Sequence, residues 1–131
     1  MSEKDNVARV TKLYEAFTKG DIGYIIDQLT DDVRWVTHLD PVVPWAGSFP
    51  GKHAVPRFFE SIANSIEVTA FTPKEFIAQG DTVVSLGDVG YRSRATGKTA
   101  VSNWVFIWKL REGRVYSYEQ FHDGELAAAF R

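Results

Sequence analysis

The chain has 131 residues, of which 44% are apolar and 24% are charged, as expected for one ordinary globular domain. Its 15 basic and 17 acidic residues give a formal charge of −2 and are mixed along the chain, which argues against nucleic acid or an anionic membrane as a partner. The absence of Cys excludes disulfides, thiolate nucleophiles and Cys-ligated metals. The N-terminus is too polar for a secretion signal and no apolar run reaches about 18 residues, so we expect a single cytoplasmic domain over residues 1–131.

An amphipathic helix is predicted over residues 5–19. Ser2 or Asp5 can cap its start, and Gly20 ends it. Its apolar residues recur at the spacing of one helical face: Val7, Val10, Leu13, Tyr14 and Phe17.

A second helix follows directly. Asp21 can cap it, its apolar residues run from Ile22 to Leu29, and the polar segment 30–32 ends it. A short strand is predicted over residues 33–37. Residues 38–52 contain three Pro and two Gly, which predicts a loop, and a third helix follows over residues 53–64.

The pattern changes after residue 65 to four strand-like segments joined by short turns, which predicts hairpins. These segments are residues 66–77, 82–93, 99–110 and 114–122. Helices followed by strands indicate an α+β fold. We expect a curved antiparallel sheet wrapped around three N-terminal helices, cone-shaped with an internal apolar pocket, and a short helical tail from Asp123.

Several segments, in this order, resemble one superfamily. The first segment is Lys19-Gly-Asp, which precedes the predicted apolar helix. The second, directly after that helix, is Asp31-Asp-Val-Arg-Trp35, and the third is Gly51-Lys-His-Ala-Val-Pro-Arg-Phe-Phe59. Trp104-Val-Phe-Ile-Trp108 and Phe121-His-Asp123 come near the end. The ordered set resembles the SnoaL-like and ketosteroid-isomerase-like proteins of the nuclear-transport-factor-2-like (NTF2-like) superfamily. The resemblance implies the fold, but that fold serves isomerases, cyclases, epoxide hydrolases, dehydratases and binding proteins, so it does not imply one function.

The last strand carries the first candidate site. Alternation places Glu119, Phe121 and Asp123 on one face, which we expect to face the pocket. In SnoaL-like polyketide cyclases an Asp at the end of this strand acts as acid–base, and Asp123 matches that position. The alternative is that Asp123 caps the short C-terminal helix. Glu119 needs a partner if buried, for which Arg92 and Arg94 are candidates, and it is otherwise a structural ion-pair residue.

The ketosteroid-isomerase comparison adds two candidates. Tyr14 lies near the position of that family's helix-1 Tyr, although counting back from Gly20 gives Leu13 instead. Asp40-Pro41 resembles the context of the family's base, with a simple turn as the alternative. Residues 99–111 contain no Asp or Glu, so the acid of that family's oxyanion hole is missing and steroid isomerase activity is not expected.

Aromatic residues make up 14% of the chain, which indicates either an aromatic core or a ring-lined pocket. The expected pocket residues are Trp35, Trp45, Phe59, Trp104, Phe106, Trp108, Glu119 and Phe121. Trp45 lies in a Pro/Gly loop, which suggests a pocket lid or a dimer contact. His38 can edge the pocket as a proton shuttle or lie on the surface. The three His residues show no metal-ligand spacing, so no metal site is expected.

Three hypotheses remain open. The preferred one is a cofactor-independent isomerase, cyclase or lyase that moves a proton in a flat apolar carbonyl compound, with Asp123 as the acid–base and Tyr14, His38 or Asp40 assisting. The second is a non-enzymatic binder of a hydrophobic molecule. The third is a dimeric interaction module, and a homodimer through the outward face that carries Val105 and Ile107 is expected in any case.

Overall fold

The structure, a computed structural model, describes residues 2–131. Its elements in chain order are α1 (Glu3–Lys19), α2 (Ile22–Asp27), β1 (Leu29–His38), β2 (Gly47–Ser48), α3 (Val55–Ser65), β3 (Ile66–Gln79), β4 (Thr82–Ser93), β5 (Thr99–Arg111), β6 (Arg114–His122) and α4 (Gly124–Ala128). The α+β class, the three N-terminal helices and the four long C-terminal strands are confirmed.

The two N-terminal helices begin and end where the capping residues predict. The Ser2 hydroxyl accepts a hydrogen bond from the Asp5 N–H at 3.0 Å, so Ser2 and not Asp5 is the cap of α1. Gly20 ends α1 at a φ of 75°, a left-handed conformation that favours glycine. Asp21 caps α2 through the Tyr24 N–H at 3.2 Å.

The predicted extent of α2 and of the first strand is wrong. Leu29 begins β1 rather than ending α2, and β1 runs through the polar segment 30–32 that was expected to separate them. The reason is tertiary, because β1 lies beside β6 and Leu29 pairs with Val115 at the start of that strand. Pairing with a neighbouring strand thus extends a segment whose own sequence has weak strand preference.

The six strands form one open, curved sheet in the order β2-β1-β6-β5-β4-β3. Strands β3 to β6 form the predicted antiparallel meander. The expectation of a wholly antiparallel sheet is wrong, because β1 runs parallel to β6. The two strands lie far apart in the sequence, and a parallel pair needs a long connection of this kind.

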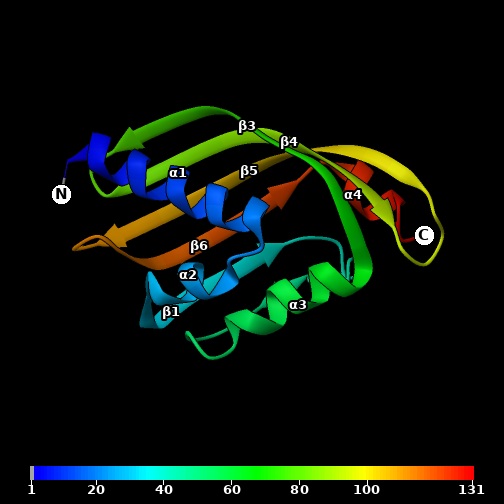
Figure 1. Cartoon of the computed structure of the whole chain (residues 1–131), viewed down its shortest axis with the longest axis horizontal. Helices are drawn as coiled ribbons and strands as arrows, with labels where there is room; N and C mark the ends of the chain where they lie inside the picture. Colours follow the sequence, from blue (N-terminus) through cyan, green and yellow to red (C-terminus); the bar gives the residue numbers. More distant parts are fainter. Residues whose placement is uncertain (1) are drawn as a thin grey trace.

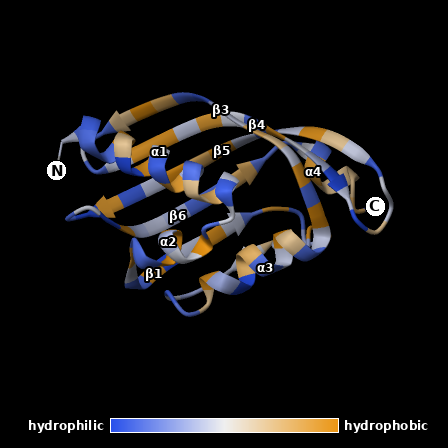
Figure 2. Cartoon of the chain, in the orientation of Figure 1, coloured by the Kyte–Doolittle hydropathy of each residue, from blue (hydrophilic) through white to orange (hydrophobic). Residues whose placement is uncertain are grey.

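The helices cover one face of this sheet and leave the other open. In Figure 1, α1 lies across the long strands, α2 and α3 lie beside β1, and α4 sits at the far end of the sheet near the C-terminus. Figure 2 shows apolar and polar residues alternating along the long strands, so only one face of each is suited to burial. The buried core therefore lies between the sheet and helices α1 to α3. Within residues 2–131, no helix has both the length and the apolar character needed to span a lipid bilayer.

Candidate functional site

An interior cavity lies between the covered face of the sheet and helices α1 and α3. It consists of two adjoining compartments of about 60 Å³ and about 50 Å³. The side chains that line both compartments are Phe17, Ile62, Phe71, Phe106 and Gln120. Each compartment has room for a few water molecules only, so a ligand as large as one aromatic ring enters when side chains of this shared wall move.

The row of rings on β5 forms much of the wall. Trp104, Phe106 and Trp108 are all buried on the inner face. The Trp104 and Phe106 rings stack with centroids 4.0 Å apart, and Phe71 of β3 stacks on Trp104 at 5.2 Å. Gly87 of β4 makes this arrangement possible, because a Cβ there would lie 2.4 Å from the Trp104 ring.

Tyr14 of α1 lines the first compartment. The Trp108 indole N–H donates a hydrogen bond to its hydroxyl oxygen at 2.8 Å. Burial raises the pKa of Tyr14, although the Ser85 hydroxyl and then the Trp108 N–H oppose this. The phenol therefore stays protonated at neutral pH and is available as a donor. Its role in catalysis stays a prediction.

A second polar group of the wall was missed from the sequence. The Gln120 amide donates to the Tyr118 hydroxyl at 2.6 Å and accepts from the Trp45 indole N–H at 3.2 Å. Burial is also the largest cause of the raised pKa of Tyr118. Trp45 is buried and packs edge-on against Phe130 at 5.6 Å, so it lines the second compartment from within the core.

The expectation that Glu119 and Phe121 face the cavity is wrong. Tyr118 pairs with Trp35 of β1, and Gln120 pairs with Phe106 of β5, so both lie among inward-facing residues. Their neighbours at 119 and 121 must then point to the opposite face. The alternating pattern was correct, but its phase was reversed.

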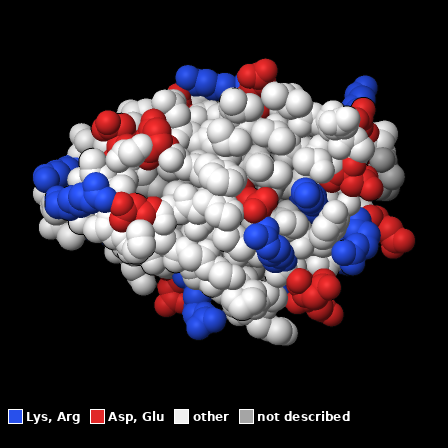
Figure 3. Space-filling view, turned by 180° about the vertical axis from the view of Figure 1, so that it is seen from behind, with Lys and Arg blue, Asp and Glu red and all other residues white. Residues whose placement is uncertain are grey.

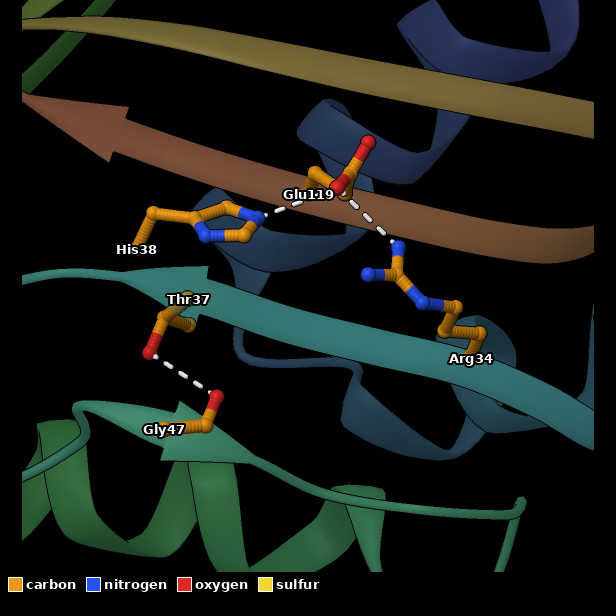
Figure 4. Close-up of polar contacts among 5 residues, drawn as sticks. All are labelled: Arg34, Thr37, His38, Gly47 and Glu119. Carbon is orange, nitrogen blue, oxygen red and sulfur yellow. Dashed lines mark hydrogen bonds and ion pairs between the residues drawn. The ribbon is translucent and has the colours of Figure 1, made fainter.

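Glu119 belongs instead to a polar cluster on the open face of the sheet. One of its carboxylate oxygens lies 3.0 Å from an Arg34 guanidinium nitrogen and 3.0 Å from the His38 Nε2 atom. Figure 4 shows these side chains in front of β1 and β6, with the N-terminal helices behind the strands. The hydrogen bonds with His38 and Arg34 lower the pKa of Glu119. The partners are therefore not Arg92 or Arg94.

His38 and Asp40 also lie outside the cavity, so their expected place at the pocket is wrong. The His38 ring stacks on Phe121 on the open face, with centroids 4.5 Å apart. Asp40 lies in the exposed loop after β1, where it accepts a hydrogen bond from the Val42 N–H at 2.9 Å and pairs with Arg131. This is the turn geometry that was the alternative for Asp40.

Asp123 caps α4, as its alternative interpretation predicted. It accepts hydrogen bonds from the Glu125 N–H at 3.2 Å, the Ser102 hydroxyl at 3.0 Å, and the backbone and side-chain amides of Asn103 at 3.0 and 3.1 Å. Partial burial by itself would raise the pKa of Asp123, but these hydrogen bonds outweigh it and lower the pKa. Asp123 is thus a fixed carboxylate that lines neither compartment, and the expectation that it faces the pocket is wrong.

His122, the residue before it, lines the second compartment together with a second titratable residue, Tyr91. Its Nδ1 atom lies 3.0 Å from the Ser102 hydroxyl oxygen. Burial lowers the pKa of His122 to about 4, although the charge of Asp123 opposes this. The imidazole is therefore neutral at pH 7. Strand alternation from Tyr118 through Gln120 leads to His122, so the sequence would have indicated His122 if the inward face of β6 had been known.

Two buried donors of the wall have no partner. The indole N–H groups of Trp35 and Trp104 are buried and make no hydrogen bond within residues 2–131. Trp35 lines the first compartment and Trp104 lines the second. An unsatisfied buried donor costs roughly 1–3 kcal/mol, so an acceptor that reached either N–H group would gain by pairing with it. Within the same described residues, no group of three His, Asp or Glu side chains is placed to hold a metal ion.

Comparisons with known proteins agree with this architecture. The SnoaL-like domain family matches residues 10–118. An NTF2-like protein from Burkholderia xenovorans LB400 is 28% identical, with a TM-score of 0.88 over 100% of this chain and 99% of that chain. An NTF2-like protein of unknown function from Burkholderia pseudomallei K96243 is 30% identical, with a TM-score of 0.82 over 94% and 92% of the two chains.

A third solved structure, TerC co-crystallised with polyporic acid, is 26% identical, with a TM-score of 0.77 over 94% of this chain and 98% of that chain. None of the curated proteins matches the chain. The family match covers most of the sequence, and the relatives share the fold over nearly their whole length. The chain therefore belongs to the SnoaL-like domain family and has the NTF2-like fold.

Proposed function

We propose that this protein binds a small, flat, largely apolar carbonyl compound in the interior cavity and acts on it as a cofactor-independent isomerase, cyclase or lyase. The observation that carries the proposal is the pair of unpartnered indole N–H groups, Trp35 and Trp104, in a wall that is otherwise made of rings. A carbonyl oxygen is an acceptor without a donor of its own, which suits such a wall. The match to TerC, which is crystallised with polyporic acid, supports an organic ligand.

Tyr14 supports proton-transfer chemistry at this site. Its phenol stays protonated because burial raises its pKa, and it lies 5.9 Å, centroid to centroid, from the Trp104 ring. A protonated phenol and an indole N–H can both stabilise negative charge that develops on a carbonyl oxygen when a neighbouring carbon loses a proton. The reaction class is therefore proton abstraction next to a carbonyl group.

Acetophenone and α-methylstyrene provide a direct test of binding. The two molecules have the same shape, but only acetophenone has a carbonyl oxygen. With ¹⁵N-labelled protein, the indole N–H signals of Trp35 and Trp104, identified from Trp35→Phe and Trp104→Phe variants, are expected to shift strongly with acetophenone and weakly with α-methylstyrene. Equal shifts with both compounds, or none with either, would contradict the proposed binding mode.

Catalysis is tested with the same probe in D₂O. An enzyme that abstracts a proton next to a carbonyl should replace the methyl protons of acetophenone by deuterium faster than buffer does, as followed by ¹H NMR. Tyr14→Phe should slow this exchange by about tenfold or more, because one stabilising donor is lost. Binding without accelerated exchange favours the second hypothesis, a non-enzymatic binder, which is supported by the use of Asp123 as a helix cap.

We also propose that the open face of the sheet pairs two copies of the chain. Phe121 is 38% exposed there, and half-buried Val105 and Ile107 lie in the middle of the same face. Figure 3, which views the molecule from this side, shows uncharged stretches of this face with acidic and basic residues both at the edge and near the centre. The ion-paired Glu119 lies beside Ile107. Sedimentation velocity should give a dimer for the native chain and a monomer for Ile107→Asp. Asn64→Asp adds the same charge on α3 and should leave the dimer intact.

A further inference from the structure

A chain of hydrogen bonds joins the half-buried imidazole of His122 to the carboxylate of Asp123 through one hydroxyl group. The Ser102 hydroxyl donates to an Asp123 carboxylate oxygen at 3.0 Å, and its oxygen lies 3.0 Å from the His122 Nδ1 atom. Ser102 is fully buried on the inner face of β5. His122 pairs with Trp104 across β5 and β6, so the ring belongs to the inner face as well.

The position of each hydrogen follows from the chemistry of the three groups. Asp123 accepts from Ser102, Asn103 and Glu125, so it is an ionised acceptor without a proton to give. The single hydroxyl hydrogen of Ser102 goes to this charged acceptor, because a charge-assisted hydrogen bond is stronger than a neutral one. The Ser102 oxygen then has only lone pairs for His122, and Nδ1 must carry the hydrogen.

We infer that His122 presents an unprotonated Nε2 atom to the second compartment as the proton acceptor for the ligand, held in this tautomer by Ser102 and Asp123. Neutral imidazole carries one hydrogen, so a hydrogen at Nδ1 leaves Nε2 as an acceptor. Nε2 makes no hydrogen bond within residues 2–131, and His122 lines the compartment. His122 is then a catalytic residue, whereas Ser102 and Asp123 are positioning residues.

This inference rests on the proposed function and names the ligand class more closely: a compound with a hydroxyl group, or an acidic C–H bond beside its carbonyl, at the end that reaches His122. The Phe106 ring lies 6.2 Å from the Tyr14 ring and 6.1 Å from the His122 ring, centroid to centroid. One flat molecule lying over Phe106 can therefore meet a donor at one end and an acceptor at the other.

The proton-transfer step balances without another reactant. The C–H proton next to the carbonyl moves to Nε2, and the electron pair of that bond forms the carbon–carbon double bond of an enolate. The negative charge then lies on the carbonyl oxygen, and the positive charge on the imidazolium is stabilised through Ser102 by the Asp123 carboxylate. Return of the proton to carbon restores the neutral imidazole and gives the exchanged or isomerised carbonyl compound.

The tautomer of His122 can be measured without any ligand. Long-range ¹H–¹⁵N correlation spectra of the full chain at pH 7, with His38→Gln, His53→Gln and His122→Phe used for assignment, distinguish a protonated from an unprotonated ring nitrogen. The expected result is a proton on Nδ1 and none on Nε2. Ser102→Ala should move the proton to Nε2, and Asp123→Asn, which keeps a capping side chain, should increase the Nε2-protonated share.

Ser117→Ala is the matched control, since Ser117 is also a buried serine, lies on the same strand as His122 and makes no side-chain hydrogen bond within the described chain. It should leave the tautomer unchanged. A proton on Nε2 in the native chain overturns the inference. The inference is also overturned if the tautomer of His122 is the same in Ser102→Ala as in the native chain. Neither result depends on whether the cavity binds a ligand.

Phenol and toluene test the acceptor role, because they share one shape and only phenol has a hydrogen to donate. The ratio of the phenol dissociation constant to that of toluene, from ¹⁵N chemical-shift titrations, should rise about tenfold in His122→Phe and stay constant in His38→Gln. An unchanged ratio in His122→Phe overturns the acceptor role while the cavity keeps its function as a binding site. Failure of both probes to bind the native protein contradicts the proposed function and the ligand role together.

Discussion

The two faces of the sheet carry similar residue types but use them differently. On the covered face, Tyr118 and Gln120 join the ring-lined cavity, where their polar atoms bind one another away from water. On the open face, the neighbouring Glu119 and Phe121 bind Arg34 and His38 close to solvent. Over residues 118–121, each face of β6 thus has one aromatic and one polar residue. The difference between a site and a surface lies in burial, not in composition.

The largest expected difference between the faces is in packing. Trp35 is 1% exposed and contacts Phe58, Trp108 and Tyr118, whereas Phe121 is 38% exposed. Trp35→Ala should lower the free energy of unfolding by about 3–5 kcal/mol, because it leaves a cavity among rings. Phe121→Ala should lower it by less than about 1 kcal/mol in a monomer. Urea denaturation measures both, and equal losses would contradict the assignment of the faces.

Acid should affect the two faces in different pH ranges. Burial lowers the pKa of folded His122 to about 4, against about 6.5 in an unfolded chain. The unfolded chain therefore binds more protons between these values, and the free energy of unfolding should fall by about 3 kcal/mol as the pH decreases from about 6.5 to about 4. His122→Phe should remove this loss, as measured by urea denaturation across that range.

Glu119 on the open face provides the contrast. Its pKa is lowered from 4.5, so its stabilising effect is complete above pH 4.5 and is lost only as the pH falls below that value. Glu119→Gln should therefore change the pH dependence of stability below about 4.5 and leave the range above it unchanged. If His122→Phe and Glu119→Gln changed the free energy of unfolding over the same pH range, the two groups would not titrate separately.

Gly87 tests how tightly the covered face is packed. An added Cβ would lie 2.4 Å from both the Trp104 ring and the Thr72 carbonyl oxygen. Gly87→Ala should lower the free energy of unfolding by about 1–3 kcal/mol, because neither neighbour is the free end of a flexible side chain. Gly124→Ala is the control, since a Cβ there meets no atom within 4 Å. Thermal unfolding compares the two, and a neutral Gly87→Ala would mean that the sheet relaxes easily.

The smallest effect is expected for the ion pair on the open face. The Arg34 side chain is 57% exposed, and its pair with Glu119 is screened by solvent. In the monomeric Ile107→Asp variant, Arg34→Gln should change the free energy of unfolding by less than about 1 kcal/mol, and added salt should reduce the difference further. A larger change in this monomer that persists at about 1 M salt would contradict a solvent-screened ion pair.

Much of the fold was predictable because its signals are local. Ser2 and Asp21 cap helices through their own side chains, and Gly20 ends a helix by its backbone conformation. The rings of β5 repeat with period two, so their common face followed from the sequence. The strand boundaries of the meander agree with the short turns for the same reason.

The candidate site was less predictable, because the segment 118–123 alternates without showing which set faces inward. The resemblance of Asp123 to an acid–base residue suggested that residues 119, 121 and 123 face inward. The structure places residues 118 and 120 on the inward face instead. The register with Trp35 and Phe106 decides the orientation, and it is a property of neighbouring strands. Asp40 was placed at a pocket by its resemblance to a base, and His38 by its position after the first strand, but both lie outside the cavity.

The sequence by itself determined the elements, their order and the supply of aromatic residues, since caps, turns and periodicity act over a few residues along the chain. Tertiary structure decided the parallel pairing of β1 with β6, the inward face of β6 and the link from Asp123 to His122 through Ser102. These outcomes depend on contacts between residues far apart in the chain. Such contacts form only when the sheet and helices are brought together.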